Sequence, residues 1–506
     1  MHLTRKPVIS FVLFLSFQLL VIAETDVATK ASPMVDHLTL QEAIQRTVAK
    51  NFIIKSSSYG VSIASAQVTE QFGLFDPKLT GSYGVSNAET PNLVNSQTGI
   101  RPPATLEKSE NYSLGIGGVL PWGFDYSVTA TNTNDRGTFN SFTYNYATFA
   151  GISGRQPLLR DFGFGATTSQ IRIALTNRSI SEWQYRQTIM DVVTRVIQAY
   201  YDLDFAYAYH RSALRSRAAT AELVAENEKR YRVGSMSEFD VTQARSRLAM
   251  QEEGVLVTAQ QITTAENALK ALITDEKNPH LLDWRIEVDP MPQAGAILIN
   301  PALDFAEALK KRPDYQQAVA SVKRADINHR YQRNQLLPKV DLVGSYGYNG
   351  YDASNDVSRR MVRNQDYHAY TYGVQVTVPL SFTTERGRYR AAKYQLQQAE
   401  TDLEKLEQDI VVNVGNAASQ ISTARQRVDA THRARELAQQ TLDAEVKRLR
   451  VGSGNTFYVL QQQDILSGSE VSEANALADY HKALAEYDRQ LGLTLERRNI
   501  SLVLPR

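Results

Sequence analysis

The chain of 506 residues contains no cysteine, which excludes disulfide bonds, thiolate metal sites, cysteine nucleophiles and a lipid-modified cysteine. Its net charge is +1 and no long run has one sign, which argues against a nucleic-acid-binding surface. The eight histidines lack metal-ligand spacing, and there is neither a phosphate-binding glycine loop nor a nucleophile elbow. We therefore expect no enzyme activity, no catalytic residue, no cofactor and no metal site.

Long apolar stretches are also missing after the first residues of the chain. Arg5 and Lys6 precede an apolar stretch from Val8 to Ala23, and the sequence turns polar directly afterwards. This pattern predicts a secretory signal peptide over 1–23 rather than a membrane anchor. No later segment approaches the ~18 consecutive apolar residues of a membrane-spanning helix. We expect an exported protein that is either soluble or inserted into a membrane as a β-barrel.

Apolar residues between Leu396 and Val428 recur at steps of three and four, which predicts one seam along a very long helix. Gly415 weakens this helix without ending it, and the first glycine pair able to end it is Gly452 and Gly454. A helix of ~65 residues would be roughly 98 Å long. Globular domains rarely use such a rod, so its length needs another explanation.

The long helix has a counterpart in the first half of the chain. At an offset of 218, the seam residues Val192, Val196, Ala199, Leu203 and Ala206 match Ile410, Val414, Ala417, Ile421 and Ala424. The turns that follow also match, as Arg232-Val233-Gly234-Ser235 and Arg450-Val451-Gly452-Ser453. The protein is therefore predicted to be a tandem repeat of helix, strands, long helix, tip and helix.

The predicted boundaries follow from this repeat. The first repeat is 24–273, the linker between repeats is 274–300 with a short strand at 284–288, the second repeat is 301–493, and a tail covers 494–506. The helices expected before the long ones are 38–71 and 305–333, and those after them are 237–273 and 456–493. The combined length of two short helices stacked end to end then roughly equals the length of one long helix.

Strict alternation of apolar and polar residues predicts strands at 79–85, 112–120, 124–130, 142–148 and 370–378, with loops at 87–110 and 132–141. The offset between matching prolines falls from 261 (Pro77 and Pro338) to 222 (Pro157 and Pro379), so the first repeat carries 39 extra residues. We place this insertion, about one hairpin, at 111–141. A soluble sheet with one wet face and a membrane barrel both fit the alternation, and the signal peptide favours the barrel.

The motifs in their duplicated order resemble the TolC-like outer-membrane efflux protein family, the outer membrane factors, over about Leu38 to Leu493. They are Leu337 to Val340 before a strand, Gln156 to Arg160 after one, and the two Arg-Val-Gly tips. The resemblance implies an α+β membrane protein. It would be a homotrimer with a shared antiparallel β-barrel in the outer membrane and a helical coiled-coil tunnel in the periplasm. Two strand pairs per protomer give a barrel of 12 strands, or 18 if the insertion joins the wall.

The resemblance also implies a function and partners. The expected function is an outer-membrane export channel of a tripartite efflux or type I secretion system, through which drugs, metals or proteins pass passively. The partners would be a periplasmic adaptor, an inner-membrane transporter and outer-membrane lipid, with no nucleic acid. A soluble, exported coiled-coil structural or adhesin-like protein is the competing hypothesis.

The candidate site residues lie at the tips and just after them. Adaptor contact is expected at Arg232, Val233, Gly234, Ser235, Arg450, Val451, Gly452 and Ser453, although the glycines also suit plain helix caps. The family's closed aperture often has aspartate rings after the second tip, where this chain has Tyr458 and Gln461. Asp240 is kept in the first repeat, either as a pore residue or as an early-turn acid favoured by the helix dipole. We take Asp240, Tyr458 and Gln461 as aperture candidates.

Overall fold

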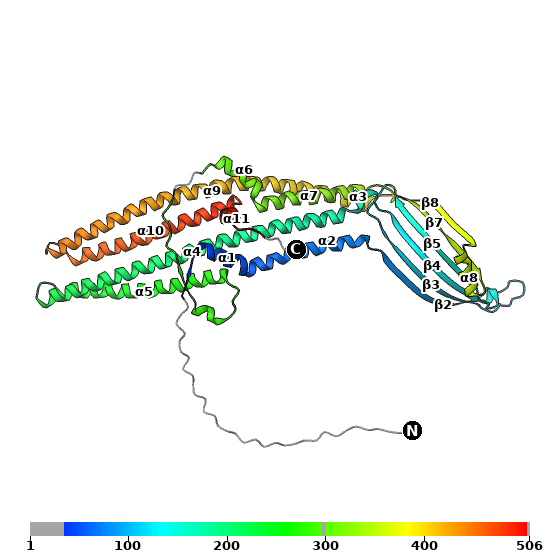
Figure 1. The fold of residues 1–506 in the computed structure, drawn as a ribbon, viewed down its shortest axis with the longest axis horizontal. Helices are drawn as coiled ribbons and strands as arrows, with labels where there is room; N and C mark the ends of the chain where they lie inside the picture. Colours follow the sequence, from blue (N-terminus) through cyan, green and yellow to red (C-terminus); the bar gives the residue numbers. More distant parts are fainter. Residues whose placement is uncertain (1–34, 296–298, 503–506) are drawn as a thin grey trace, which may run out of the picture.

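The computed structural model describes residues 35–295 and 299–502. The expected signal peptide, 1–23, lies outside the described residues. A rod of long helices carries an antiparallel sheet at one end (Figure 1). Among the described residues, no helix combines the length and apolarity needed to cross a membrane.

Six antiparallel strands form the large sheet, in the order β2-β3-β4-β5-β7-β8. They are β2 (Lys78–Thr90), β3 (Thr105–Val119), β4 (Asp125–Gly137), β5 (Tyr146–Pro157), β7 (Lys339–Asp352) and β8 (Tyr367–Thr377). The hairpin of β3 and β4 is the extra one of the first repeat, and it lies within the sheet between β2 and β5. The insertion therefore widens the sheet of each protomer from four strands to six.

Several strand limits differ from those predicted. The strand expected to begin at Phe142 begins at Tyr146, because Ser141 and Phe142 have left-handed φ angles of 51° and 58° and form a turn. The loop expected at 132–141 is shorter, since β4 continues to Gly137, and the loop expected at 87–110 is reduced to the residues between β2 and β3. The polar composition of these segments suggested loops. Pairing with the neighbouring strands extends β2, β3 and β4 into them.

The two very long helices are confirmed as α4 (Ser169–Arg232, 64 residues) and α9 (Thr383–Arg450, 68 residues). Each is followed by a tight turn and a second long helix, α5 (Glu238–Ile273) or α10 (Thr456–Gln490). The predicted seam of α9 is buried at its centre, where Ile410, Val414 and Ile421 are at most 3% exposed. Gly415 does not interrupt the helix.

The single helices expected at 38–71 and 305–333 are each two helices. The first pair is α1 (Leu40–Lys50) and α2 (Phe52–Phe72), and the second is α6 (Pro301–Lys311) and α7 (Pro313–Asn334). Asn51 causes the first break: its side chain accepts hydrogen bonds from the amides of Ile53 and Ile54 and donates to the Leu272 carbonyl. Pro313 causes the second, because the residue before a proline is disfavoured in a helix.

The helices form a layer whose order matches that of the strands. Near the sheet α4 packs between α2 and α7, and α7 packs against α9; in the far half α4 packs between α5 and α10, and α10 packs against α9. The edges of the helical layer are therefore α2 with α5 on one side and α9 on the other, and the edge strands β2 and β8 adjoin α2 and α9 (Figure 1).

A small second sheet lies at the middle of the rod, where β1 (Val35–Leu38) pairs in parallel with β6 (Arg285–Val288). β6 confirms the short strand expected in the linker. The Tyr200 hydroxyl of α4 donates to the Leu38 carbonyl at 3.0 Å and accepts from the Asp289 amide at 3.0 Å. Burial raises the pKa of Tyr200 to about 12, so the hydroxyl keeps the proton that this bridge requires.

Short elements complete the chain. They are α3 (Gly163–Thr167), α8 (Asn355–Asn364), α11 (Thr494–Arg497) and single 3₁₀ turns at Gly73–Phe75, Thr138–Asn140 and Pro279–Asp283. α8 follows β7 and folds back onto the sheet, and α11 lies in the segment expected to be a tail.

Candidate functional site

One face of the six-stranded sheet is apolar and fully open to its surroundings. Register places every second residue of the strands on this face, and large side chains there are 44–84% exposed. They are Leu79, Tyr83, Val85, Tyr112, Leu114, Ile116, Val128, Ile152, Leu342, Tyr346, Tyr370, Tyr372, Val374 and Val376. An exposed apolar surface of this extent is unstable in water and indicates contact with lipid or another protein.

The opposite face carries small and hydroxyl side chains. Ser82 faces Ser113 at 2.7 Å, Ser127 faces Ser153, and further across the sheet Ser345 faces Thr371. These cross-strand hydroxyl pairs suit a surface in contact with water. The sheet therefore separates an apolar side from a hydrated side.

Aromatic residues lie at two levels of the sheet. Tyr83 and Tyr112 have ring centroids 4.7 Å apart near the middle of β2 and β3, and Tyr370 stacks on Tyr372. At the helix end Trp122 and Phe164 lie 6.4 Å apart, and both are exposed. Aromatic residues at two levels around an apolar band are typical of membrane strands, and strands of 11 to 15 residues are long enough to cross a membrane.

Both edges of the sheet are open within the described residues. β2 pairs only with β3, and β8 pairs only with β7. Every residue of β2 is exposed. Long, flat and unprotected edge strands pair with other strands when they can.

The two tips, at the other end of the rod, have the same geometry. Gly234 and Gly452 have φ angles of 75° and 79°, the left-handed region that a residue without a Cβ adopts freely. The Ser235 amide donates to the Arg230 carbonyl at 2.9 Å, and the Ser453 amide donates to the Arg448 carbonyl at 3.0 Å. Together with the glycine amides, these bonds form a Schellman motif at each tip.

Apolar side chains project from both tips. Val233 and Val451 are 78% and 79% exposed, and the exposed rings of Phe239 and Phe457 follow them at the start of the next helix. Our sequence reasoning did not single out the two phenylalanines, although the offset of 218 aligns them. Each tip therefore presents a valine and a phenylalanine to a partner, beside the basic last turn of the preceding helix.

The aperture candidates lie in the first turns of α5 and α10. Asp240 takes part in a local cap: its amide donates to the Ser237 hydroxyl at 3.2 Å, and that hydroxyl donates to the Asp240 carboxylate at 2.6 Å. Tyr458 is 53% exposed with its ring edge-on to Phe457, and Gln461 is exposed one turn later. Tyr458 and Gln461 share one face of α10, whereas the Asp240 carboxylate is bonded to Ser237 in the cap of its own helix.

The two hairpins are linked just behind the tips. The Arg230 guanidinium donates to the Leu449 carbonyl of α9 at 3.2 Å, and Arg247 of α5 forms an ion pair with Asp464 of α10. Leu223, Leu449, Val459 and Leu460 form a small apolar cluster at the same level. These contacts hold the end of the rod together within one protomer.

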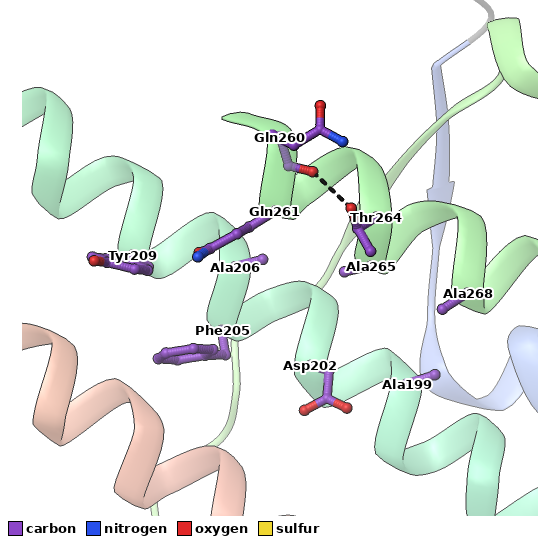
Figure 2. Close-up of a pocket in the computed structure, with 10 residues that line it drawn as sticks. All are labelled: Ala199, Asp202, Phe205, Ala206, Tyr209, Gln260, Gln261, Thr264, Ala265 and Ala268. Carbon is purple, nitrogen blue, oxygen red and sulfur yellow. Dashed lines mark hydrogen bonds between the residues drawn. The ribbon is translucent and has the colours of Figure 1, made fainter. Parts of the chain in front are cut away.

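A shallow groove separates α4 from α5, and Figure 2 shows the side chains that line it. Alanines of both helices leave space beside Phe205 and Tyr209, whose rings stack at 6.1 Å. The Thr264 hydroxyl bonds to the Gln260 carbonyl of its own helix, and Asp202 pairs with Lys482. The groove has no arrangement of nucleophile, acid and base, and the described residues hold no cluster able to bind a metal.

Comparison with known proteins identifies the class to which this geometry belongs. The model of the family described as outer membrane efflux protein matches residues 123–274 and 305–493. The chain belongs to the outer membrane efflux protein family. It is an outer-membrane export channel of the kind used in tripartite efflux or type I secretion, and not an enzyme. The alternative of a soluble coiled-coil adhesin is set aside on this ground.

Individual relatives agree with the family. The chain is 23% identical to the outer membrane efflux protein BepC of Brucella suis over 446 residues, 87% of this chain and 82% of the relative. It is 27% identical to the proteases secretion protein PrtF of Dickeya chrysanthemi, over 58% of this chain and 63% of the relative. The structure of the CmeC outer membrane channel of Campylobacter jejuni superposes with a TM-score of 0.67 at 16% identity, covering 90% of this chain and 86% of that one, and therefore shares the fold.

The Schellman motifs give a direct prediction. Replacing Gly234 by Ala places a Cβ in the left-handed region at a cost of ~1–2 kcal/mol, so the tip amides should exchange with deuterium roughly tenfold faster. Gly415→Ala is the control, because this glycine lies within a helix with no atom within 4 Å of an added Cβ and the change favours the helix. Equal exchange at the tip in Gly234→Ala and the unaltered protein would contradict the cap assignment.

Proposed function

We propose that three copies of this chain form one ring, in which the sheets close into a barrel of eighteen strands continuous with a helical tunnel. The observation that carries this proposal is the shared order of the two layers. The open edges of the sheet are β2 and β8, and the open edges of the helical layer are α2 with α5 and α9. A ring would pair the edges of both layers at once, because the β2 and α2/α5 edge of each protomer would meet the β8 and α9 edge of its neighbour.

The directions of the edge strands support this pairing. β2 runs away from the helices and β8 runs toward them, because β2 follows α2 and β8 precedes α9. They would therefore meet as an antiparallel pair, and the alternation of the six strands would continue around the ring. Closure satisfies the open backbone groups of both edges, which lipid cannot do.

The helical edges also carry apolar residues that lack a cover within the protomer. Ile63 of α2 and Leu256 of α5 are 58% and 72% exposed on one edge, and Leu437 of α9 is 62% exposed on the other. The alanine-lined groove between α4 and α5 adds a surface that would accept side chains of a neighbour.

We propose that the two tips of each protomer contact a periplasmic adaptor, which connects the channel to an inner-membrane transporter. Val233 and Val451 give the contact its apolar centre, flanked by Arg232 and Arg450, while Gly234, Ser235, Gly452 and Ser453 fix the turns. An apolar centre with a basic rim is suited to recognition of a protein partner. Substrates would pass by diffusion through the tunnel, and the transporter would select them.

We further propose that Tyr458 and Gln461 narrow the closed end of the tunnel, with Asp240 of the first repeat as a weaker candidate because its carboxylate caps its own helix. An aromatic constriction would replace the acidic ring found in some relatives, and it would confer little preference for cations.

Ring closure can be tested in the naturally cysteine-free chain. Ser82→Cys on β2, combined in turn with Ala369→Cys, Thr371→Cys or Gly373→Cys on the same face of β8, should give covalent trimers on oxidation in at least one register. Ser82→Cys with Thr129→Cys on the interior strand β4 is the control and should remain monomeric on denaturing gels. Absence of cross-linking in all three registers would refute the closed ring.

The apolar centre of the proposed adaptor surface should not tolerate a carboxylate. Val233→Asp with Val451→Asp would place a charged, hydrated group where the contact needs an apolar one, so export should fall at least tenfold while the trimer remains in the outer membrane. Sensitivity of a deletion strain to detergents, dyes and metals measures export, and adaptor co-purification measures contact. The matched double Val→Ile variant preserves an apolar tip and should retain function. Unimpaired export and co-purification in the aspartate variant would exclude the tips.

The aromatic constriction predicts a change in conductance. Tyr458→Ala should raise the single-channel conductance in planar bilayers several-fold, because the narrowest section limits ion flow. Ile465→Ala, two turns further along α10, should leave it unchanged. If Tyr458→Ala conducts like the unaltered protein, Tyr458 does not line the constriction.

A further inference from the structure

The helix α8 lies at the end of the sheet distant from the rod (Figure 1), and the strand register puts the residues it contacts on the apolar face. It joins β7 to β8 but packs against β7 and β5, away from the open edges. The residues under it are Asn132, Thr148 and Gly350, which lie side by side in register on β4, β5 and β7. Each is two positions beyond a residue of the apolar face (Ala130, Ala150 and Tyr348), so α8 covers the outer limit of that face.

Specific contacts fix α8 in this place. The Ser358 hydroxyl donates to Thr148 Oγ1 at 2.7 Å, and the Asn132 amide donates to both Thr148 Oγ1 and Asn355 Oδ1. A Cβ at Gly350 would lie 2.0 Å from the Ser358 carbonyl oxygen, so only glycine allows this approach. Ser358 is completely buried.

The side of α8 turned away from these contacts is basic. Arg359, Arg360 and Arg363 are exposed and cluster on one side of the helix, because their spacing is one and four residues. Asp356 is the only acidic residue of α8. Within the described part of the chain none of the three arginines forms an ion pair, so no protein carboxylate neutralises the cluster in the protomer.

We propose that these three arginines bind the phosphate groups of an anionic lipid headgroup in the outer leaflet. The inference rests on the proposed function, in which the apolar face of the sheet contacts lipid. Headgroups then lie at the outer limit of that face, where α8 is held. A guanidinium group binds phosphate through two parallel charge-assisted hydrogen bonds, and basic side chains beside a membrane attract anionic lipid.

The flank of α8 agrees with this location. Val357 and Met361 are half-buried on the side of the helix opposite Arg359 and Arg363. An amphipathic helix with one apolar and one basic flank is suited to the boundary between acyl chains and headgroups. A soluble anion would have no need of the apolar flank, and this favours a lipid over a free phosphate.

The test uses the full-length protein in neutral detergent, with lipid A bearing its phosphates as the probe. Retention of lipid A by the variant R359Q/R360Q/R363Q should be at least about tenfold weaker than by the unaltered protein. The variant R359K/R360K/R363K, which keeps the charge but loses the planar fork, should bind with intermediate strength. Lipid A without phosphates should bind weakly to every form.

A matched control removes the same charge elsewhere. Arg386, Arg388 and Arg390 are exposed in the first turns of α9, at the opposite end of the sheet. R386Q/R388Q/R390Q should retain lipid A normally. Equal loss in both glutamine variants would mean general electrostatic attraction, and unchanged retention in the α8 variant would exclude the site; either result overturns the proposal. Displacement of lipid A by millimolar inorganic phosphate would assign the cluster to a soluble anion and overturn it as well.

Two further measurements separate this proposal from that of the ring. The α8 variant should still float with phospholipid vesicles and still form the cross-linked trimer, because its arginines form no hydrogen bond or ion pair with the described residues of the protomer. Weak lipid A retention by a protein that floats and cross-links supports the headgroup site. Failure of the unaltered protein to float would instead refute the membrane orientation on which both proposals depend.

Discussion

The unpaired backbone N–H and C=O groups on the open edges of β2 and β8 are the constraint on which the rest of the structure depends. Each edge strand is paired on one side only, and the sheet between them has one apolar and one hydroxyl-bearing face, which would contact lipid and water in the proposed ring. A backbone amide or carbonyl without a partner costs several kcal/mol in hydrocarbon, so an isolated sheet of this kind has no stable place in a membrane. The protomer is in this sense an incomplete fold, and assembly into the proposed ring would supply its missing hydrogen bonds.

The helical rod continues the same arrangement in water. α4 and α9 run its full length, and the shorter helices are stacked beside them, so every level contains helices in the order set by the strands. The interruption at Asn51 comes at the middle of the rod, near the small sheet of β1 and β6, and that at Pro313 separates α6 from α7, both of which pack against α9. Beside the small sheet, Glu266 accepts a hydrogen bond from Tyr207 and lies beside Lys270, whose pKa is lowered by burial. The middle of the rod thus holds buried polar groups inside an apolar core that includes Leu38, Leu269 and Ile286.

The features with strong periodicity could be predicted from sequence, and those decided by tertiary contacts could not. The seam of α9 and its match in α4 were readable because helical spacing and the offset of 218 agree over many residues. The break at Asn51 depends on a bond to the distant Leu272 carbonyl, which no local pattern contains. α8 was missed because its residues are polar and follow a strand; its contacts with Thr148 and Gly350 stabilise it. Phe239 and Phe457 could have been found, since the repeat aligns them with each other.

The extra hairpin of β3 and β4 has a consequence for how the sheet joins the rod. Six strands spaced ~4.8 Å apart and tilted by about 40° occupy an arc of ~38 Å, whereas four such strands would occupy only ~25 Å. Four helices side by side, at 8–10 Å each, occupy roughly 32–40 Å. In the proposed ring, the hairpin would therefore bring the circumference of the membrane section up to that of the helical section. The passage would then keep its bore across the junction instead of tapering at the membrane surface.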